Sequence, residues 1–579
     1  MVTEKGSDPS MSATATHISW DGTRTPLKTT LFLVVCITWL LPGLIGHDPW
    51  KYDEAVVFGV VSDILRTGDW ISFRIAEEPF FGKAPLFVWT AALLGKLLGG
   101  IMPLHDAARL AAGVYVAATL YFLSRAGAEL LGERGIRISV LLFIGCVGLL
   151  IRAHEMTSDL AGLTGIAIAL YGVALAHRRP YAGGAITGAG IGIAFLGNGF
   201  LPAGMILFTL VVLPAIAPYW RTPRYAATVG IALAAAAPLV ALWPLLLSAA
   251  GPGAFHAWLE TAATSRWTDS VPRDAGIESL YFIRLLPWYA WPAWPLAAWA
   301  LWRSRRALLD RRELLLPLGA FIAFFLAASV MGDPRDSNAM AMLLPLAILG
   351  AAELDSLPRG AASALDWFGM MTFLSLAAII WTGFFAATTG EPAPAVQWLQ
   401  REVPGFRYRF SFVSCALAAL LTLIWIVVVA RSLRSTRRAI VNWAAGITMS
   451  WMLMMTLGLP LVDQARSYRE VSAKLVSELP LDFRCIARSN VGDAQRALLN
   501  YFANITTVSI EMPASRVCKV LLVQAAPLKM PRSVGPEWEE VWRGSRPGDR
   551  HELFILYKRR LDGPLLEKLD PVPDRKLGT

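Results

Sequence analysis

Apolar and polar positions fall in long separate blocks along this chain. Apolar runs of about 20 residues, the length that crosses a bilayer as a helix, recur over most of the sequence. Helices are predicted because backbone groups in lipid must form hydrogen bonds within their own segment. The runs assigned to membrane spans are 29–46, 107–124, 137–151, 157–176, 183–197, 200–217, 225–249, 283–302, 313–331, 338–352, 365–387, 409–430 and 438–460.

The charges of the connecting loops predict which side of the membrane each loop faces. Five basic loops should face the cytoplasm: 125–137, 177–181, 219–224, 303–312 and 431–438. They do so together only if a further apolar run, 84–101, does not cross. We therefore place 84–101 in a juxtamembrane or re-entrant helix of the outer loop 47–106. This leaves about 13 spans, an inner N-terminus and an outer C-terminus.

The composition supports a multi-pass membrane protein. The chain has 579 residues, of which 55% are hydrophobic and only 17% charged, and this excludes an ordinary soluble protein. The net charge of +10 lies mostly in the short basic loops, so no nucleic-acid partner is expected. Residues 1–28 are polar and form a cytoplasmic N-terminus. No small-residue cleavage site follows the first run, which predicts an uncleaved first helix.

The C-terminal region, 461–579, is polar and long enough for a small domain. Segments 519–524 and 552–560 are rich in β-branched and aromatic residues and predict strands. The fold class is therefore an all-α polytopic membrane domain, 29–460, with a small α/β domain outside the cytoplasm. Cys485 and Cys518 lie in this domain, where either a disulfide or two free buried thiols fits the sequence.

The outer loops carry the unusual acids and bases. From Asp53 onward, apolar positions follow helical spacing and predict an interfacial helix with one face on the bilayer. Asp53 would start this helix near the head-group level, either as a helix-capping acid or as a catalytic one.

Each of the other charged residues on the outer face also has a functional and a structural interpretation. Lys83 precedes an apolar half-helix and fits either a lipid phosphate or a side chain that anchors the helix. Asp159 would lie about one turn inside the membrane end, as an acid facing a cavity or as a helix N-terminal acid. Arg266 and Arg335 fit head-group contact or loop solvation.

The order of these motifs resembles that of a known family. An Asp-Glu pair in "HDPWKYDEA", then "TGDW", then "KAPLFVW" is similar to the superfamily of protein O-mannosyltransferases and aminoarabinose (4-amino-4-deoxy-L-arabinose) transferases, which have the GT-C fold. The first motif is most similar to the aminoarabinose-transferase branch. The resemblance extends over about the first 350 residues and is loose in the C-terminal region.

The resemblance implies a reaction. It predicts a glycosyltransferase that uses an undecaprenyl-phosphate sugar at the periplasmic face of a bacterial inner membrane, with inversion. Asp53 would be the base, supported by Glu54 in the substrate site, and Asp159 the second acid. Lys83, with Arg266 and Arg335, would stabilise the departing phosphate. The implied acceptor is lipid A or a related envelope glycan, reached through a hydroxyl or a phosphate.

Three positions depart from the pattern of that branch. Gly82 stands where an acid is usual and Ala263 where a histidine is usual, and these two positions can bind a metal in the branch. We therefore predict no site metal and no cofactor, although His256 is near enough in sequence to replace one ligand. Asn198 stands where a lysine is frequent and weakens one phosphate contact. A different donor sugar is consistent with these changes.

Three alternative functions remain open from the sequence. A protein O-glycosyltransferase of the same fold differs only in its acceptor. A flippase of a lipid-linked sugar would move its lipid without consuming it, and would commonly show inverted repeats, which are not evident here. A scaffold protein would use 461–579 for binding and would have no enzymatic phenotype.

Overall fold

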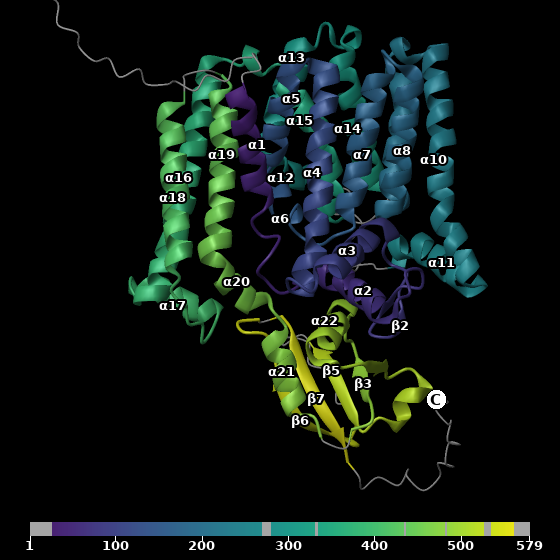
Figure 1. The fold of residues 1–579 in the computed structure, drawn as a ribbon, viewed down its shortest axis with the longest axis vertical. Helices are drawn as coiled ribbons and strands as arrows, with labels where there is room; N and C mark the ends of the chain where they lie inside the picture. Colours follow the sequence, from purple (N-terminus) through teal and green to yellow (C-terminus); the bar gives the residue numbers. More distant parts are fainter. Residues whose placement is uncertain are drawn as a thin grey trace, which may run out of the picture.

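The structure is a computed structural model that describes residues 26–268, 280–330, 334–432, 436–480, 483–525, 534–549 and 551–560. Residues 26–28, 252 and 263–268 are described by their backbone alone. A bundle of long helices stands side by side, and a smaller C-terminal domain lies below one end of it (Figure 1). The long and medium helices of the bundle are α1 (Pro26–Leu40), α4 (Leu104–Leu131), α5 (Glu133–Ile144), α7 (Asp159–Ala176), α8 (Pro180–Asn198), α9 (Phe200–Ile216), α10 (Pro223–Ala250), α13 (Ala293–Ser304), α14 (Arg312–Val330), α15 (Met340–Ala352), α16 (Arg359–Thr389), α18 (Phe412–Arg431) and α19 (Arg438–Leu453).

Every predicted apolar run falls on helical structure, but not always on one helix. Seven helices in the described residues are long and apolar enough to cross a bilayer, and four shorter apolar helices accompany them. The predicted run 283–302 is divided between α12 (Tyr281–Tyr289) and α13, with Pro292 at the break, because proline removes a backbone donor. The last run continues from α19 through η6 (Met454–Gly458) into α20 (Leu459–Arg466). The total of 13 spans stays a prediction.

The predicted basic loops meet one another. Arg134, in the first turn of α5, and Arg437, just before α19, both form ion pairs with Asp355, at 3.6 Å and 2.6 Å. Asp355 belongs to η5 (Leu354–Ser356), which follows α15. Because α4 begins beside α3 near the C-terminal domain (Figure 1), its other end carries these loops away from that domain.

The first outer loop packs inside the protein. It contains α2 (Asp53–Thr67), the short hairpin β1 (Arg74–Ile75) and β2 (Glu78–Pro79), and α3 (Pro85–Leu98). The apolar face of α2 was expected on the bilayer, and this expectation is wrong: Val57, Val60 and Val61 are fully buried. They pack against protein because α3, α4 and α22 (Asp493–Ala503) all contact α2.

Small residues bring α7 and α8 very close together. A Cβ at Gly165 would lie 2.3 Å from the Ala194 nitrogen, and one at Gly190 would lie 2.6 Å from the Ala169 nitrogen. Such contacts let helix backbones approach in a membrane, where packing rather than the hydrophobic effect drives association. The pair is thereby fixed in register, with Asp159 starting α7 and Asn198 ending α8.

The C-terminal domain is α/β, as predicted. Its sheet has the strand order β4-β3-β5-β7-β6, with β3 parallel to β4 and β5, and β7 antiparallel to β5 and β6. A disulfide joins Cys485 to Cys518, just before β3 and β5, so the disulfide alternative holds. The strands are β3 (Ile486–Ser489), β4 (Thr507–Ser509), β5 (Val520–Ala525), β6 (Trp538–Gly544) and β7 (Leu553–Arg559), with helices α21 (Arg469–Ser477) and α22 beside them.

Candidate active site

Asp53 and Glu54 open α2 but point to different environments. Successive residues on a helix are rotated by about 100°, so neighbours face different sides. Asp53 lines a large cavity. Glu54 is 2% exposed and accepts hydrogen bonds from Arg109 at 2.5 Å and from the Trp50 amide at 2.9 Å. Glu54 therefore lies behind the cavity wall and not in it.

The cavity has a volume of about 470 Å³ and two kinds of wall. Its charged lining residues are Asp53, Lys83, Asp159, Arg335 and Asp493. Its aromatic lining residues include Phe80, Phe81, Phe195, Phe200, Trp243 and Trp258. A site of this shape suits a ligand with a charged or polar head and a long apolar tail.

Asp53 is held by two cations. Lys83 donates to its Oδ1 at 3.0 Å, and Arg152 Nη1 lies 3.5 Å from its Oδ2. The charge of Lys83 holds the pKa of Asp53 below its usual value, against the effect of burial. Burial by itself would lower the pKa of Lys83, but the charges of Asp53 and Asp159 outweigh it and raise that pKa. Both side chains are therefore charged at neutral pH.

Arg152 connects Asp53 to the segment before α15. Its guanidinium donates to Asp336 at 3.1 Å and 2.8 Å and to Glu155 at 2.9 Å. Asp336 begins η4 (Asp336–Ala339) and follows Arg335, which lines the cavity. Burial raises the pKa of Glu155 to about 7, and the negative charges of Glu54 and Asp53 add to that effect while Arg152 opposes it.

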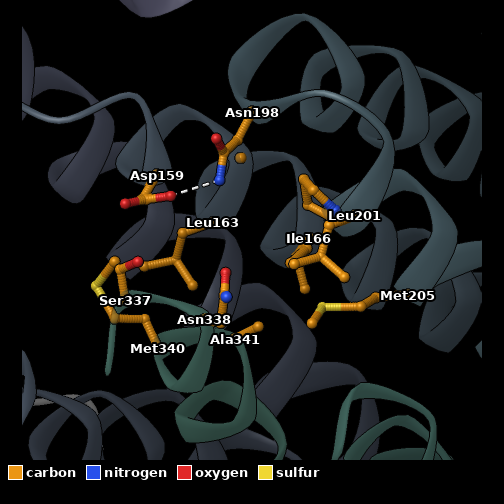
Figure 2. A pocket seen from close by; sticks show the side chains of 12 residues that line it. Asp159, Leu163, Ile166, Asn198, Leu201, Met205, Ser337, Asn338, Met340 and Ala341 are labelled. Atoms are coloured by element: carbon orange, nitrogen blue, oxygen red, sulfur yellow. Dashed lines mark hydrogen bonds between the residues drawn. The ribbon is translucent and has the colours of Figure 1, made fainter. Parts of the chain in front are cut away.

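Asp159 lies on the same cavity and is bonded on both sides. Asn198 donates to its Oδ1 at 2.5 Å, and Thr157 donates to its Oδ2 at 3.0 Å. Figure 2 shows the bond between Asp159 and Asn198, with Ser337 and Asn338 on the same small pocket of about 20 Å³. Asn198, where the resemblance places a lysine, is thus the partner of the second acid.

Arg109 is a buried structural centre. It is fully buried and donates to Glu54, to Asp106 at 2.7 Å and to the His47 carbonyl at 3.0 Å. A buried arginine needs such a full set of acceptors. Through Glu54 and its bond to the Trp50 amide, Arg109 fixes the backbone just before Asp53.

The C-terminal domain is attached to the loop that carries Asp53. Asp48 accepts bonds from Ser467 at 2.6 Å and from Arg469 at 2.5 Å. Lys51 lies 3.1 Å from Glu552, and Arg488 lies 2.6 Å from Glu78. Partners more than 400 positions apart in sequence therefore hold the start of α2 in place.

The structure brings together most of the predicted site residues. Asp53, Lys83, Asp159 and Arg335 all line the cavity, and Glu54 supports it from behind. The side chain of Arg266, in α11 (Pro252–Thr268), is outside the described residues. Within the described ranges no group of three or more His, Cys, Asp or Glu residues could hold a metal ion, and metal independence stays a prediction.

The sequence did not single out Asp336 or Asp493 as site residues. Asp336 directly follows the predicted site residue Arg335 in "GDPRDSN", and this position was the one sequence feature that could have indicated it. Asp493 comes from the C-terminal domain, and nothing local to "GDAQRALL" indicates that it reaches a membrane-side cavity.

No protein-family model and no curated protein matches the sequence. The crystal structure of ArnT from Cupriavidus metallidurans bound to undecaprenyl phosphate matches the fold with a TM-score of 0.64 at 17% identity, covering 92% of this chain and 98% of that one. The apo form of ArnT matches with a TM-score of 0.63 at 17% identity, covering 91% and 97%. The oligosaccharyltransferase of Archaeoglobus fulgidus gives a TM-score of 0.43 at 10% identity, covering 84% of this chain and 64% of that one. ArnT is an aminoarabinose transferase of the GT-C class, and this chain therefore has the GT-C fold.

Proposed function

We propose that this protein is a membrane glycosyltransferase that moves a sugar from a polyprenyl-phosphate carrier to an acceptor hydroxyl or phosphate. The observation that carries the proposal is the ion pair of Asp53 and Lys83 in a cavity that aromatic side chains also line. Likeness in fold to ArnT, whose crystal structure holds undecaprenyl phosphate, supports the class of donor.

The two kinds of cavity wall divide the donor between them. The aromatic walls cover the isoprenoid chain, which gains from leaving water. Lys83 and Arg335, which line the same cavity, bind the phosphate. The anomeric carbon is then held next to Asp53.

Lys83 controls when Asp53 becomes a base. Without a donor, Lys83 neutralises Asp53 directly across 3.0 Å. A bound phosphate competes for the ammonium group, so Asp53 loses part of its partner's charge and its proton affinity rises. Donor binding thus prepares the base for the acceptor.

The transfer itself is a single displacement. Asp53 takes the proton of the acceptor hydroxyl as the oxygen attacks the anomeric carbon. The bond from that carbon to the phosphate oxygen breaks, and the phosphate leaves with the electron pair. Lys83 stabilises the charge that develops there. Attack opposite to the leaving group inverts the anomeric centre, and a phosphate acceptor would need no base.

The acceptor that we propose is lipid A or a related envelope glycan at the periplasmic face of a bacterial inner membrane. Helix α2, which begins at Asp53, lies at the end of the bundle next to the C-terminal domain (Figure 1), away from the contact between the basic loops at Asp355. Asp159, bonded to Asn198, is placed to orient the acceptor or the base.

The test is mass spectrometry of envelope lipids and glycans from cells with the wild-type protein, Asp53→Asn or Glu77→Gln. Glu77 is a largely exposed acid of the same outer loop and serves as the matched control. We expect a mass difference of one sugar with the wild type and the control, and at least a ~100-fold loss with Asp53→Asn. Transfer at the wild-type rate by a correctly inserted Asp53→Asn protein removes Asp53 as the base.

A further inference from the structure

A residue of the C-terminal domain contributes to the lining of the cavity. Asp493, the first residue of α22, lines it together with Asp53, the first residue of α2. The two helices are in tight contact, since a Cβ at Gly59 would lie 2.5 Å from the Ala497 Cβ. Two packed helices thus present an aspartate at the same end, one from each domain.

Asp493 is positioned by neighbours but not covered by them. Arg496 donates to its Oδ1 at 2.9 Å and also bonds the Ile75 carbonyl and Glu78, each at 2.9 Å. The outer-loop hairpin therefore sets the place of this pair. The Asp493 side chain is 38% exposed, which leaves it accessible from the cavity that it lines.

The charge of Asp493 excludes some ligands. A carboxylate repels the phosphate of a lipid carrier, which has Lys83 and Arg335 as its cations in the same cavity. It accepts hydrogen bonds well from hydroxyl groups, because a charged acceptor forms the stronger bonds. The cavity lining thus offers cations to an anion and a carboxylate to the hydroxyl groups of a polyhydroxylated ring.

We propose that Asp493 is a substrate-contacting residue that accepts hydrogen bonds from the hydroxyl groups of a sugar ring. The ring belongs either to the sugar being transferred or to the acceptor glycan. This inference rests on the proposed glycosyltransferase function. It makes the C-terminal domain a part of the substrate site that helps to determine specificity, and not merely a cover over the cavity.

A purely structural role predicts a different result. An acid in the first turn of a helix interacts favourably with the helix dipole. Its pairing with Arg496 would then serve only to hold the C-terminal domain in place. In that case its removal would lower stability and would weaken every ligand alike. Arg496 keeps Ile75 and Glu78 as partners, so we expect Asp493 variants to fold.

The experiment uses full-length protein with Asp493→Asn, Asp493→Ala or the control Glu540→Gln. Glu540 is also a C-terminal-domain acid paired with an arginine three positions later, at 2.6 Å, but on β6. Two quantities are measured. One is the affinity for undecaprenyl phosphate, and the other is sugar transfer from the lipid-linked sugar fraction extracted from the cells that produce the protein. We expect unchanged undecaprenyl phosphate affinity in all variants, and transfer that falls about tenfold or more in Asp493→Ala.

The kinetic constants identify the source of the ring. A higher KM for the lipid-linked sugar assigns Asp493 to the transferred sugar, and a higher KM for the acceptor fraction assigns it to the acceptor. Wild-type transfer by Asp493→Ala overturns the inference, as does an equal loss of undecaprenyl phosphate affinity and transfer. If the wild-type protein itself transfers no sugar, the proposed function fails first.

Discussion

Lys83 Nζ lies 3.0 Å from Asp53 Oδ1, although the two residues are 30 positions apart, Asp53 at the start of α2 and Lys83 in the loop before α3. Both residues line the cavity, and Arg152 Nη1 lies 3.5 Å from the other carboxylate oxygen of Asp53. Removing Lys83 therefore affects the leaving group and the base together.

Lys83→Met should change the pH dependence of transfer as well as its rate. The charge of Lys83 lowers the pKa of Asp53, and a base must be deprotonated to act. In kcat/KM for the donor, which reports the free enzyme, the wild type therefore loses activity only as the pH falls through that lowered value. In Lys83→Met the pKa of Asp53 rises, so the acid limb of the profile moves to higher pH. We also expect a loss of about 100-fold or more at the optimum.

The measurement is the transfer rate as a function of pH, with Lys83→Arg as the control. Arginine keeps the cation, so it should leave the acid limb closer to that of the wild type. An acid limb that is identical in Lys83→Met and the wild type contradicts the pairing.

Arg109→Met should destabilise the protein by about 3–5 kcal/mol, because it leaves Glu54 as a buried unpaired charge. Glu54→Gln keeps the arginine bonds to Asp106 and the His47 carbonyl, so a smaller loss is expected. The melting temperature of the protein in detergent should therefore be lower for Arg109→Met than for Glu54→Gln. Arg560→Met removes an arginine that is 59% exposed and pairs with an equally exposed acid, Glu539, so it should have almost no effect.

Glu155→Gln should reduce the pH dependence of stability. The folded-state pKa of Glu155 is raised from 4.5 to about 7, so the native protein binds more protons than the unfolded chain between these values. Its stabilising contribution is complete below the unfolded value and is lost as the pH rises through the folded one. Melting temperatures of the variant should therefore fall less than those of the wild type between about pH 5 and about pH 7.5. Glu470→Gln, an exposed acid in α21, should follow the wild type.

Replacing both Cys485 and Cys518 with serine should destabilise the C-terminal domain by about 3–4 kcal/mol, because the cross-link closes a loop of 33 positions. Limited proteolysis should cut this domain sooner in the double variant. A reducing agent should bring the wild type to the same rate and leave the variant unchanged. Cys415→Ser, a free thiol of α18, is the control.

The membrane part of the fold follows from local signals, and so does half of the site. Long apolar runs locate the helices, and the motif order identifies Asp53, Lys83 and Asp159. The burial of α2 does not follow, because its apolar spacing fits a bilayer as well as a protein neighbour. The neighbour α22 lies more than 400 positions away in the sequence. Asp493 and the bonds of Asp48 to Ser467 and Arg469 are hidden for the same reason.

The glycine contacts between α7 and α8 also limit how the molecule can move. A sideways shift or rotation of either helix would force backbone atoms together, so Asp159 and Asn198 form an immobile reference point at one end of the cavity. A ligand that fills the cavity therefore meets a boundary at Asp159 and Asn198 that does not adjust to its shape.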